Sequence, residues 1–498
     1  MSSDPTPHTP HPTPHRAPNP NIRVRFAPSP TGYVHVGSLR TALYNYLFAR
    51  HHGGVNILRV EDTDQTRYVE GAVENLLRTM EWAGITFDEG PTQGGEYGPY
   101  TQSERTEIYR THADELVANG KAYYCFCSSE RLDEVRKKMQ AAGQPPMYDR
   151  HCRNLSADEV KAKMDAGEKH VVRLRVPLGE TITFNDIVRG EVSFESKTID
   201  DQVLLKSDGF PTYHLANVVD DKKMKISHVI RGEEWLSSTP KHVLLYRAFG
   251  WENDMPQFAH LPLLLNPDRS KLSKRQGDVA VEDFKQQGYL PETLVNFVAL
   301  LGWNPSDTQE IYTIDELIAS FDLAKVNKAG AVFGREKLDW MNAEYIRKKS
   351  VDELFPQVKA LAEAKAISAT DEYLKKVIGL MQERVRTMND FVDFSIYFYK
   401  APTEFDEKSK AKNWNDDAKT RLTELLPQLE ALSEWSHTAI EQVVRSYAET
   451  KGISAGKLIH PLRLSVSGVG MGPSLFEMLE TIGQQEVTTR ISYALKHL

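Results

Sequence analysis

Hydrophobic and polar positions near the start of the chain alternate with a period of two and then change to a helical period. Over 22–26, apolar residues alternate with two arginines, which predicts a strand. A proline-rich turn follows at 28–32, and apolar residues then recur at helical spacing until Gly53. A second strand and helix follow over 55–80. This order of strand and helix predicts a parallel sheet covered by helices.

The order of strand and helix is interrupted between about residues 102 and 213. This part contains all the cysteines, a basic helix near 131–139, and short strands over 171–176 and 203–206. We therefore predict that it is inserted into the sheet domain.

The strand and helix pattern resumes from Tyr213, with a strand at 228–231 and a helix at 243–249. After about residue 345, apolar residues recur almost only at helical spacing, which indicates a separate helical module. The fold class that we predict is α/β, with a Rossmann-type doubly wound parallel sheet, an inserted α/β domain and an all-helical C-terminal part. The expected domains are a disordered tail (1–20), a Rossmann catalytic domain (21–101 and 214–250), the insertion (102–213), a domain that carries a basic loop (251–345) and the helical part (346–498).

The composition of the chain is consistent with the predicted fold class and domains. The 498 residues are enough for three or more domains, and 40% of them are hydrophobic. We find no run of about 18 uncharged apolar residues, so we expect no membrane segment. The three cysteines all lie between 125 and 152, which is not typical of a disulfide framework. We expect a cytoplasmic monomer, and the net charge of −8 does not exclude a nucleic-acid partner.

Two short segments carry the candidate chemistry. The first runs from Arg25 through a proline-rich turn to His35-Val36-Gly37-Ser38, where backbone N–H groups at a helix start favour a phosphate. The second, Lys271-Leu272-Ser273-Lys274-Arg275, offers two lysines that suit departing phosphates. Either segment alone is more typical of a surface turn or a solvated basic loop. Together, in this order and separation, they predict adenylyl transfer.

These segments resemble the HIGH and KMSKS motifs of the class I aminoacyl-tRNA synthetases, and the chain is most similar to the bacterial glutamyl-tRNA synthetases. Further matching stretches are Arg59-Val60-Glu61-Asp62-Thr63-Asp64, the segment 211–221 and Val229-Ile230-Arg231-Gly232-Glu233-Glu234-Trp235. Two positions depart from the motifs, since Ser38 replaces the last histidine and Arg275 the last serine. The resemblance implies a glutamate–tRNA ligase that uses ATP, Mg²⁺, L-glutamate and tRNA(Glu).

The resemblance also implies a pocket for glutamate with two cations and one anion. Arg25 would bind the side-chain carboxylate with help from Tyr213 and Asn217. Arg231 would bind the α-carboxylate, while Glu61 and Ser29 would bind the amino group. Singly, each could equally be a strand-end residue in a surface ion pair.

ATP would lie between the two motifs. The implied contacts are His35, Gly37, Ser38, Lys271, Ser273 and Lys274. We expect His35 to act at the phosphates, and Lys274, more than Lys271, to act on the pyrophosphate.

The cysteines form Cys125-Phe126-Cys127 and the more distant Cys152. Thiolates suit zinc, which takes four ligands in structural sites, but three reduced structural thiols would give the same sequence pattern. Some members of the family carry zinc at such a site with a tyrosine as fourth ligand, here Tyr148, and others have lost the metal. His151 is the more conventional chemical choice.

By the resemblance, the insertion would bind the tRNA acceptor end, 251–345 would contact its stem, and 346–498 would bind the anticodon. We place Arg384 and Arg386 on one helix of the last part as candidate anticodon contacts. The alternatives are a non-catalytic tRNA-binding homologue and a glutaminyl-type enzyme. The persistence of His35, Lys271 and Lys274 disfavours the first, and the helical C-terminal part disfavours the second.

Overall fold

The computed structural model describes residues 17–272 and 279–498, which form two compact units. We call them the N-terminal unit, which extends to Phe284 and includes 294–334, and the C-terminal unit, which comprises 285–293 and 335–498. Residues 1–16 of the expected tail lie outside the described residues. No helix of the described chain is long and apolar enough to cross a membrane.

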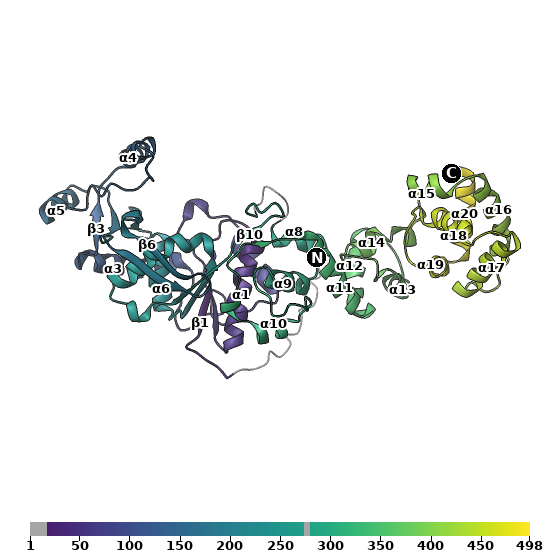
Figure 1. Ribbon diagram of the computed structural model, residues 1–498, viewed down its shortest axis with the longest axis horizontal. Helices are drawn as coiled ribbons and strands as arrows, with labels where there is room; N and C mark the ends of the chain where they lie inside the picture. The colour runs from purple at the N-terminus through teal and green to yellow at the C-terminus, as the bar shows by residue number, and fades with distance from the viewer. Residues whose placement is uncertain (1–16, 273–278) are drawn as a thin grey trace. The chain divides into compact units, whose positions relative to one another are not determined.

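The N-terminal unit begins with the predicted strand, turn and helix (Figure 1). Its first elements are β1 (Arg23–Phe26), α1 (Val36–His52), β2 (Val55–Leu58) and α2 (Ala72–Trp82). Helix α1 ends where Gly53 takes a left-handed conformation with φ 66°. The backbone N–H groups of Gly53 and Gly54 return to the last carbonyls of the helix, as expected for a glycine stop.

The strands that precede the predicted site are parallel. β1 pairs with β2, and β8 (His228–Gly232) pairs with β9 (Gln257–Leu261). The backbone N–H of Ser227 donates to the carbonyl of Arg23 at 2.9 Å, which places β8 beside β1. The carboxyl ends of these strands therefore meet at one edge, where open α/β sheets bind their ligands.

The predicted insertion contains two different structures. The strands β3 (Ala122–Cys125), β4 (Val171–Leu174) and β7 (Val203–Leu205) form an antiparallel sheet, with α4 (Ser129–Ala141) and α5 (Ala157–Asp165) nearby (Figure 1). The hairpin of β5 (Thr181–Asp186) and β6 (Gly190–Glu195) instead joins the β8–β9 sheet, because Asp186 pairs with Phe258 of β9. One hairpin of the insertion is thus part of the central sheet.

The N-terminal unit also contains the helices α3 (Thr106–Ala118), α6 (Tyr213–Lys223), α7 (Thr239–Ala248) and α10 (Ile314–Ser320). The short strands β10 (Leu264–Leu265) and β11 (Ala331–Val332) pair in parallel as a separate sheet. Helices α8 (Val281–Gln286) and α9 (Pro291–Ala299) lie where the chain passes between the two units.

The C-terminal unit is helical in all its described regular elements beyond residue 334, as the periodicity predicts. Its helices are α11 (Arg335–Lys348), α12 (Val351–Ala364), α13 (Asp371–Met381), α14 (Asp390–Asp393), α15 (Glu407–Asn413), α16 (Asp416–Glu430), α17 (His437–Thr450), α18 (Gly456–Ser467), α19 (Leu475–Ile482) and α20 (Gln484–His497). All of these helices except α15 contribute buried apolar side chains to one core, to which the predicted face of α13 contributes Leu374, Val377, Ile378 and Met381.

Candidate functional site

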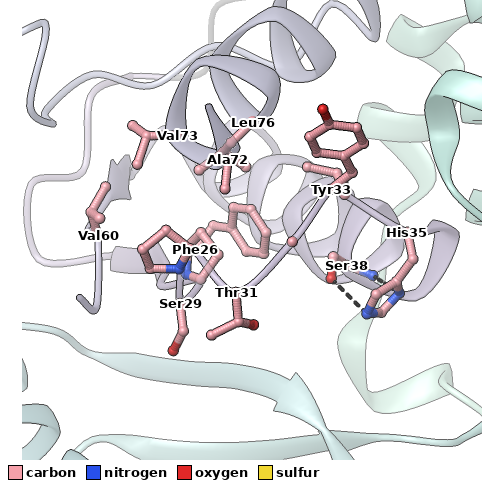
Figure 2. A pocket seen from close by; sticks show the side chains of 14 residues that line it. Phe26, Ser29, Thr31, Tyr33, His35, Ser38, Val60, Ala72, Val73 and Leu76 are labelled. Carbon is pink, nitrogen blue, oxygen red and sulfur yellow. Dashed lines mark hydrogen bonds between the residues drawn. The ribbon is translucent and has the colours of Figure 1, made fainter. Parts of the chain in front are cut away.

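The turn between β1 and α1 borders a cavity of about 270 Å³ (Figure 2). Ser29, His35 and Ser38 contribute polar groups to its lining, and Phe26 and Leu76 are among its apolar side chains. The first motif therefore forms a hollow at the carboxyl edge of the sheet, next to a helix start.

His35 caps the start of α1. Its Nδ1 accepts a hydrogen bond from the backbone N–H of Ser38 at 3.1 Å, and Ser38 Oγ lies 3.1 Å from His35 Nε2 (Figure 2). The ring lies so close to Gly37 that a Cβ there would be 3.0 Å from His35 Nδ1. The structure thus brings His35, Gly37 and Ser38 together at the helix end that carries partial positive charge.

Residues shortly after the second motif pair with the first motif, although more than 200 residues separate them in the sequence. The backbone N–H of Val36 donates to the carbonyl of Val279 at 2.9 Å, and that of Val281 donates to Val34 at 2.9 Å. The chain that returns from the second motif is therefore paired with the residues that lead into α1.

The second motif is anchored at its other end as well. The backbone N–H of Leu272 donates to the carbonyl of Leu264 at 2.9 Å, and Lys271 is exposed. Ser273 and Lys274 lie outside the described residues. Both described flanks of the motif thus adjoin the carboxyl edge of the sheet.

A buried network of charges holds two of the expected glutamate contacts. Arg25, at 3% exposure, donates through Nε and Nη2 to the two carboxylate oxygens of Asp221, at 3.1 and 3.4 Å. Arg59 donates to Asp221 Oδ1 at 2.7 Å and to Glu61 Oε1 at 2.9 Å. Among the described residues, the hydrogen bonds of the Arg25 guanidinium use Nε and Nη2, so Nη1 remains available to a ligand.

Asn217 lies inside the same network. With its amide oriented to satisfy its neighbours, its oxygen accepts from Arg25 Nη2 and Arg59 Nη2, each at 3.2 Å. Its nitrogen then donates to Asp221 Oδ2 at 3.2 Å. Asn217 therefore links both arginines to their shared carboxylate.

The pKa values of the two buried carboxylates shift in opposite directions. Burial would raise the pKa of Asp221, but the charges of Arg25 and Arg59 outweigh it and hold the pKa below its usual value. Burial raises the pKa of Glu61, and the same arginines only partly offset it. Asp221 therefore ionises more readily than Glu61 and is the stronger counter-ion for the two arginines.

Arg231 is also buried, but it differs from Arg25 in the partners of its guanidinium. It is 5% exposed at the end of β8, and burial lowers its pKa. Its guanidinium donates to Tyr213 Oη at 2.7 Å and to Thr239 Oγ1 at 2.9 Å. No carboxylate of the described residues forms an ion pair with it, so a ligand carboxylate would supply the missing counter-charge.

Ser29 and Tyr213 complete the expected set. Ser29 is exposed on the cavity wall, and the N–H of Glu61 donates to the carbonyl of the preceding Pro28 at 3.0 Å. Tyr213 contacts Arg231 rather than Arg25, with which the sequence analysis groups it. Burial raises the pKa of Tyr213, which keeps its hydroxyl protonated.

Sequence reasoning missed Asp221, Arg59 and His260 as parts of this site. Asp221 is the second of two acidic residues that follow two valines on a helix, and Arg59 follows a buried strand, so charged residues next to an apolar run were the available signal. His260 likewise interrupts the apolar run of β9, where its Nε2 accepts from Arg231 Nε at 3.1 Å.

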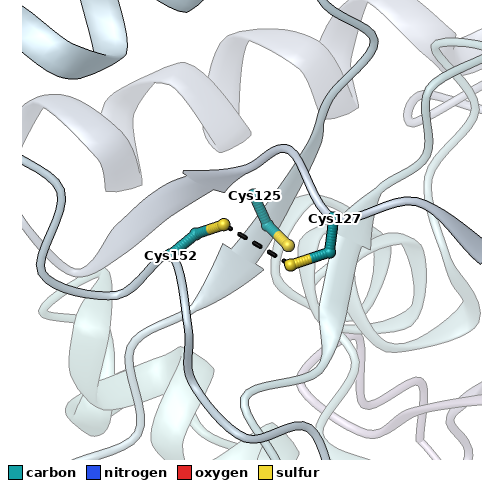
Figure 3. Close-up of side chains that lie close together, drawn as sticks. All are labelled: Cys125, Cys127 and Cys152. Carbon is teal, nitrogen blue, oxygen red and sulfur yellow. Dashed lines mark hydrogen bonds between the residues drawn. The ribbon is translucent and has the colours of Figure 1, made fainter. Parts of the chain in front are cut away.

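The three cysteines converge at the end of β3 (Figure 3). Their Sγ atoms all lie within 4.8 Å of one another, and those of Cys127 and Cys152 are 3.5 Å apart. Tyr148 Oη lies 3.3 Å from the Sγ of Cys125 and 3.5 Å from that of Cys127. The structure thus brings Tyr148 to the thiols. In the described chain, no histidine or carboxylate joins this group, and His151 is exposed.

The four ligand atoms fit a tetrahedral zinc ion. Zn–S distances of about 2.3 Å and Zn–O distances of about 2.0 Å imply S···S and S···O separations of roughly 3.5–3.8 Å. The Cys127–Cys152 separation of 3.5 Å and the Tyr148 separations of 3.3 and 3.5 Å are close to this range. A hydrogen bond from Cys152, opposed by burial and helped by Tyr148, lowers the pKa of the Cys125 thiol to about 4. Thiolate character suits a metal ligand.

Arg384 and Arg386 are both exposed, but they do not lie on one helix as the periodicity suggested. Helix α13 ends at Met381, and both arginines lie in the turn before α14. The carboxylate of Asp390 accepts from the backbone N–H of Arg386 at 2.8 Å, and such a side chain competes with helix continuation. Arg384 Nε donates to the carbonyl of Gly472 at 2.8 Å.

Two family models match the chain. The catalytic-domain model of class I tRNA synthetases (E and Q) matches residues 21–340. The anticodon-binding-domain model matches residues 351–495.

Curated relatives match over nearly the whole chain. A glutamate–tRNA ligase of Prosthecochloris aestuarii is 51% identical over 96% of this chain and 98% of its own length. One of Chloroherpeton thalassium is also 51% identical, over 96% and 98% of the two chains. Among solved structures, a glutamate tRNA ligase from Elizabethkingia meningosepticum in complex with its amino acid is 42% identical, with a TM-score of 0.89 over 96% of this chain and all of that one.

We predict that Asp221→Asn destabilises the N-terminal unit, because it leaves Arg25 and Arg59 buried with one negative charge fewer. The expected loss is about 3–5 kcal/mol of unfolding free energy, measured by urea denaturation. The matched control is Asp165→Asn, which removes the exposed ion pair with Lys161 and should cost under about 0.5 kcal/mol. Equal, small losses in both variants would contradict this account of the network.

Proposed function

The chain belongs to the glutamate–tRNA ligases of class I, and we propose that it activates L-glutamate with ATP and transfers the glutamyl group to the 3′-terminal ribose of tRNA(Glu). The observation that carries this proposal is the pairing of Val34–Val36 with Val279–Val281. It sets the helix start of the first motif against the flank of the second, so that one ATP can contact both.

Glutamate would bind between the two buried arginines. Arg231, which has no carboxylate partner among the described residues, suits the α-carboxylate. Arg25 keeps Nη1 for the side-chain carboxylate, and its Nε and Nη2 are held by Asp221. Tyr213 accepts from Arg231, so its own O–H proton can be donated to the substrate.

Two further assignments concern the amino group and the side-chain carboxylate. Glu61 and Ser29 would accept from the ammonium group, because both adjoin the turn after β1. Asn217 would support Arg25 through the contact between its amide oxygen and Arg25 Nη2.

The reaction then proceeds in two steps without a covalent enzyme intermediate. An α-carboxylate oxygen of glutamate attacks the α-phosphorus of ATP, and pyrophosphate leaves. A terminal ribose hydroxyl of the tRNA next attacks the acyl carbon of the glutamyl-adenylate, and AMP leaves. The protein acts by holding the reactants in line and by stabilising charge on the phosphates.

His35 and the start of α1 would act on the phosphates of ATP, with Gly37 and Ser38 as further contacts. Lys271, Ser273 and Lys274 would act on the departing pyrophosphate, and Lys274 carries the larger part in this proposal. Mg²⁺, which enters with ATP, would shield the phosphate charges.

Transfer requires the tRNA as the second substrate. We propose that the insertion binds its acceptor end and that the C-terminal unit binds its anticodon, since that unit contains the region matched by the anticodon-binding model. Arg384 and Arg386 are candidate contacts there because both guanidinium groups belong to exposed residues. The helical C-terminal unit and the names of the relatives favour this function over a glutaminyl-type enzyme.

ATP–pyrophosphate exchange tests the proposed function directly. We expect exchange with glutamate but not with glutamine at equal concentration, measured with and without tRNA, because two buried arginines favour a second carboxylate over an amide. Absence of exchange under every condition would favour the non-catalytic tRNA-binding alternative.

We predict that Arg231→Lys and Arg25→Lys each lower kcat/KM for glutamate by roughly 10- to 150-fold, since a lysine cannot reproduce the planar fork and charged hydrogen bonds contribute about 1.5–3 kcal/mol. The matched control is Arg50→Lys, in the ion pair between Arg50 and Asp88 at the end of α1. Exchange kinetics at varied glutamate concentration measure the effect. Lysine variants as active as the control would show that the pocket lies elsewhere.

We also propose that Cys125, Cys127, Cys152 and Tyr148 bind one structural zinc ion, which would hold the tip of the insertion together. Tyr148→Phe should weaken zinc binding by at least about tenfold, because it removes the fourth ligand. His151→Ala is the matched control and should retain the metal. Zinc content after purification without chelator measures both. Active wild-type protein without zinc would refute the site.

A further inference from the structure

The guanidinium of Arg231 is held by neutral groups from several elements. It is 5% exposed, and four of its five N–H groups donate hydrogen bonds to four protein acceptors. They are Tyr213 Oη, Thr239 Oγ1, the carbonyl of Trp235 and Nε2 of His260. The one remaining N–H is on Nη1, beside the Tyr213 hydroxyl. The orientation of the guanidinium plane therefore decides where that N–H points.

His260 is the neighbour of Arg231 on the adjacent parallel strand, and its side chain is fully buried. Its Nε2 lies 3.1 Å from Arg231 Nε. A guanidinium can only donate, so Nε2 must accept and the ring proton must be on Nδ1. Burial lowers the pKa of His260 to about 4, which keeps the ring neutral.

Asp186 fixes this tautomer from the other side. Its Oδ2 lies 2.6 Å from His260 Nδ1 and accepts the Nδ1 proton. Its Oδ1 accepts three backbone N–H groups, from Val188 at 3.0 Å, Arg189 at 2.8 Å and His260 at 3.3 Å. The carboxylate can therefore not turn without losing several hydrogen bonds. Asp186 is the last residue of β5, in the hairpin that the insertion adds to the central sheet.

We propose that Asp186 and His260 are positioning residues, which select the ring tautomer that accepts from Arg231 and so orient its guanidinium toward the α-carboxylate of glutamate. Neither residue touches the substrate. This role rests on the proposed function, because that function makes Arg231 the carboxylate ligand. By this role, Asp186 of the insertion helps to position the amino-acid pocket.

The isosteric variant Asp186→Asn separates this role from packing. The three backbone N–H groups retain the amide oxygen at the Oδ1 position, so the amide NH₂ faces His260 Nδ1 and donates to it. The ring then carries its proton on Nε2, so that two hydrogen-bond donors, His260 Nε2–H and Arg231 Nε–H, face each other. A wrong tautomer of this kind strongly impairs the Ser-His-Asp triad of serine proteases.

We expect Asp186→Asn to lower kcat/KM for glutamate by at least about tenfold while KM for ATP changes by less than about twofold. The control is Asp254→Asn, on the exposed turn before β9, where Asp254 pairs with Lys222. It should leave both constants near those of the wild type. A role in packing alone predicts no effect of Asp186→Asn on glutamate, because asparagine has the same shape.

His260→Gln and His260→Phe provide a second test. Glutamine can donate to Asp186 and accept from Arg231 through one amide group, so it should retain activity with glutamate within about fivefold. Phenylalanine has an aromatic ring that can neither donate to Asp186 nor accept from Arg231. The His260→Phe variant should therefore lose activity with glutamate by at least about tenfold. Similar activity in these two variants would overturn the proposal.

Nitrogen-15 NMR of histidine-labelled full-length protein tests the tautomer without any assay of activity. We expect the proton of His260 on Nδ1 in the wild type and on Nε2 in Asp186→Asn. A switched tautomer with an unchanged glutamate KM would overturn the positioning role, and so would an unswitched tautomer. If the wild type shows no glutamate-dependent exchange at all, the proposed function fails, whatever the NMR result.

Discussion

Two adjacent carboxylates on α6, Asp220 and Asp221, hold separate parts of the N-terminal unit together through buried ion pairs. Asp221 binds Arg25 of β1 and Arg59 after β2, at 3.1 and 2.7 Å. Asp220 accepts from Arg105 Nε at 2.8 Å and, at its other oxygen, from Gln102 and Tyr109. All of these side chains are buried. Buried charges require partners, so these elements can pack only when α6 lies among them.

This arrangement has a topological consequence. The first strands and α6 lie on opposite sides of a long insertion in the sequence, and Arg105 and Tyr109 belong to the segment where that insertion begins. The two acidic residues therefore join three separate parts of the chain at the sheet edge. The contacts that join these parts therefore also position Arg25 and Asn217 within the site.

Charge compensation also distinguishes the two arginines of the expected pocket. Arg25 is compensated by Asp221 and keeps one nitrogen for a ligand, whereas Arg231 is surrounded by neutral acceptors. The charge compensation of each arginine suits the carboxylate that we propose it binds. A compensated arginine can be buried in the absence of substrate at little cost, and an uncompensated one attracts a carboxylate strongly.

Much of this could be predicted from the sequence, for identifiable reasons. Periodicity identified β1, α1 and β8 because those segments bury one face or both. The first motif marked the helix start, and Val279–Val281, which follow the second motif, pair with the residues that lead into that helix. The partners of the site could not be predicted in the same way. Asp221 meets Arg25 across nearly 200 residues, and Asp186 meets His260 through a strand pairing that no local pattern encodes. The turn after α13 depends on a hydrogen bond from the backbone N–H of Arg386 to the carboxylate of Asp390, which competes with continuation of the helix.

The central claim is that two differently compensated arginines bind the two ends of one glutamate beside the start of α1. A crystal structure of the full chain with a non-hydrolysable glutamyl-adenylate analogue tests it most directly. The account predicts the side-chain carboxylate at Arg25 Nη1, the α-acyl end toward Arg231 and the phosphate at the start of α1. An analogue bound in the reverse orientation, or away from both arginines, would contradict it.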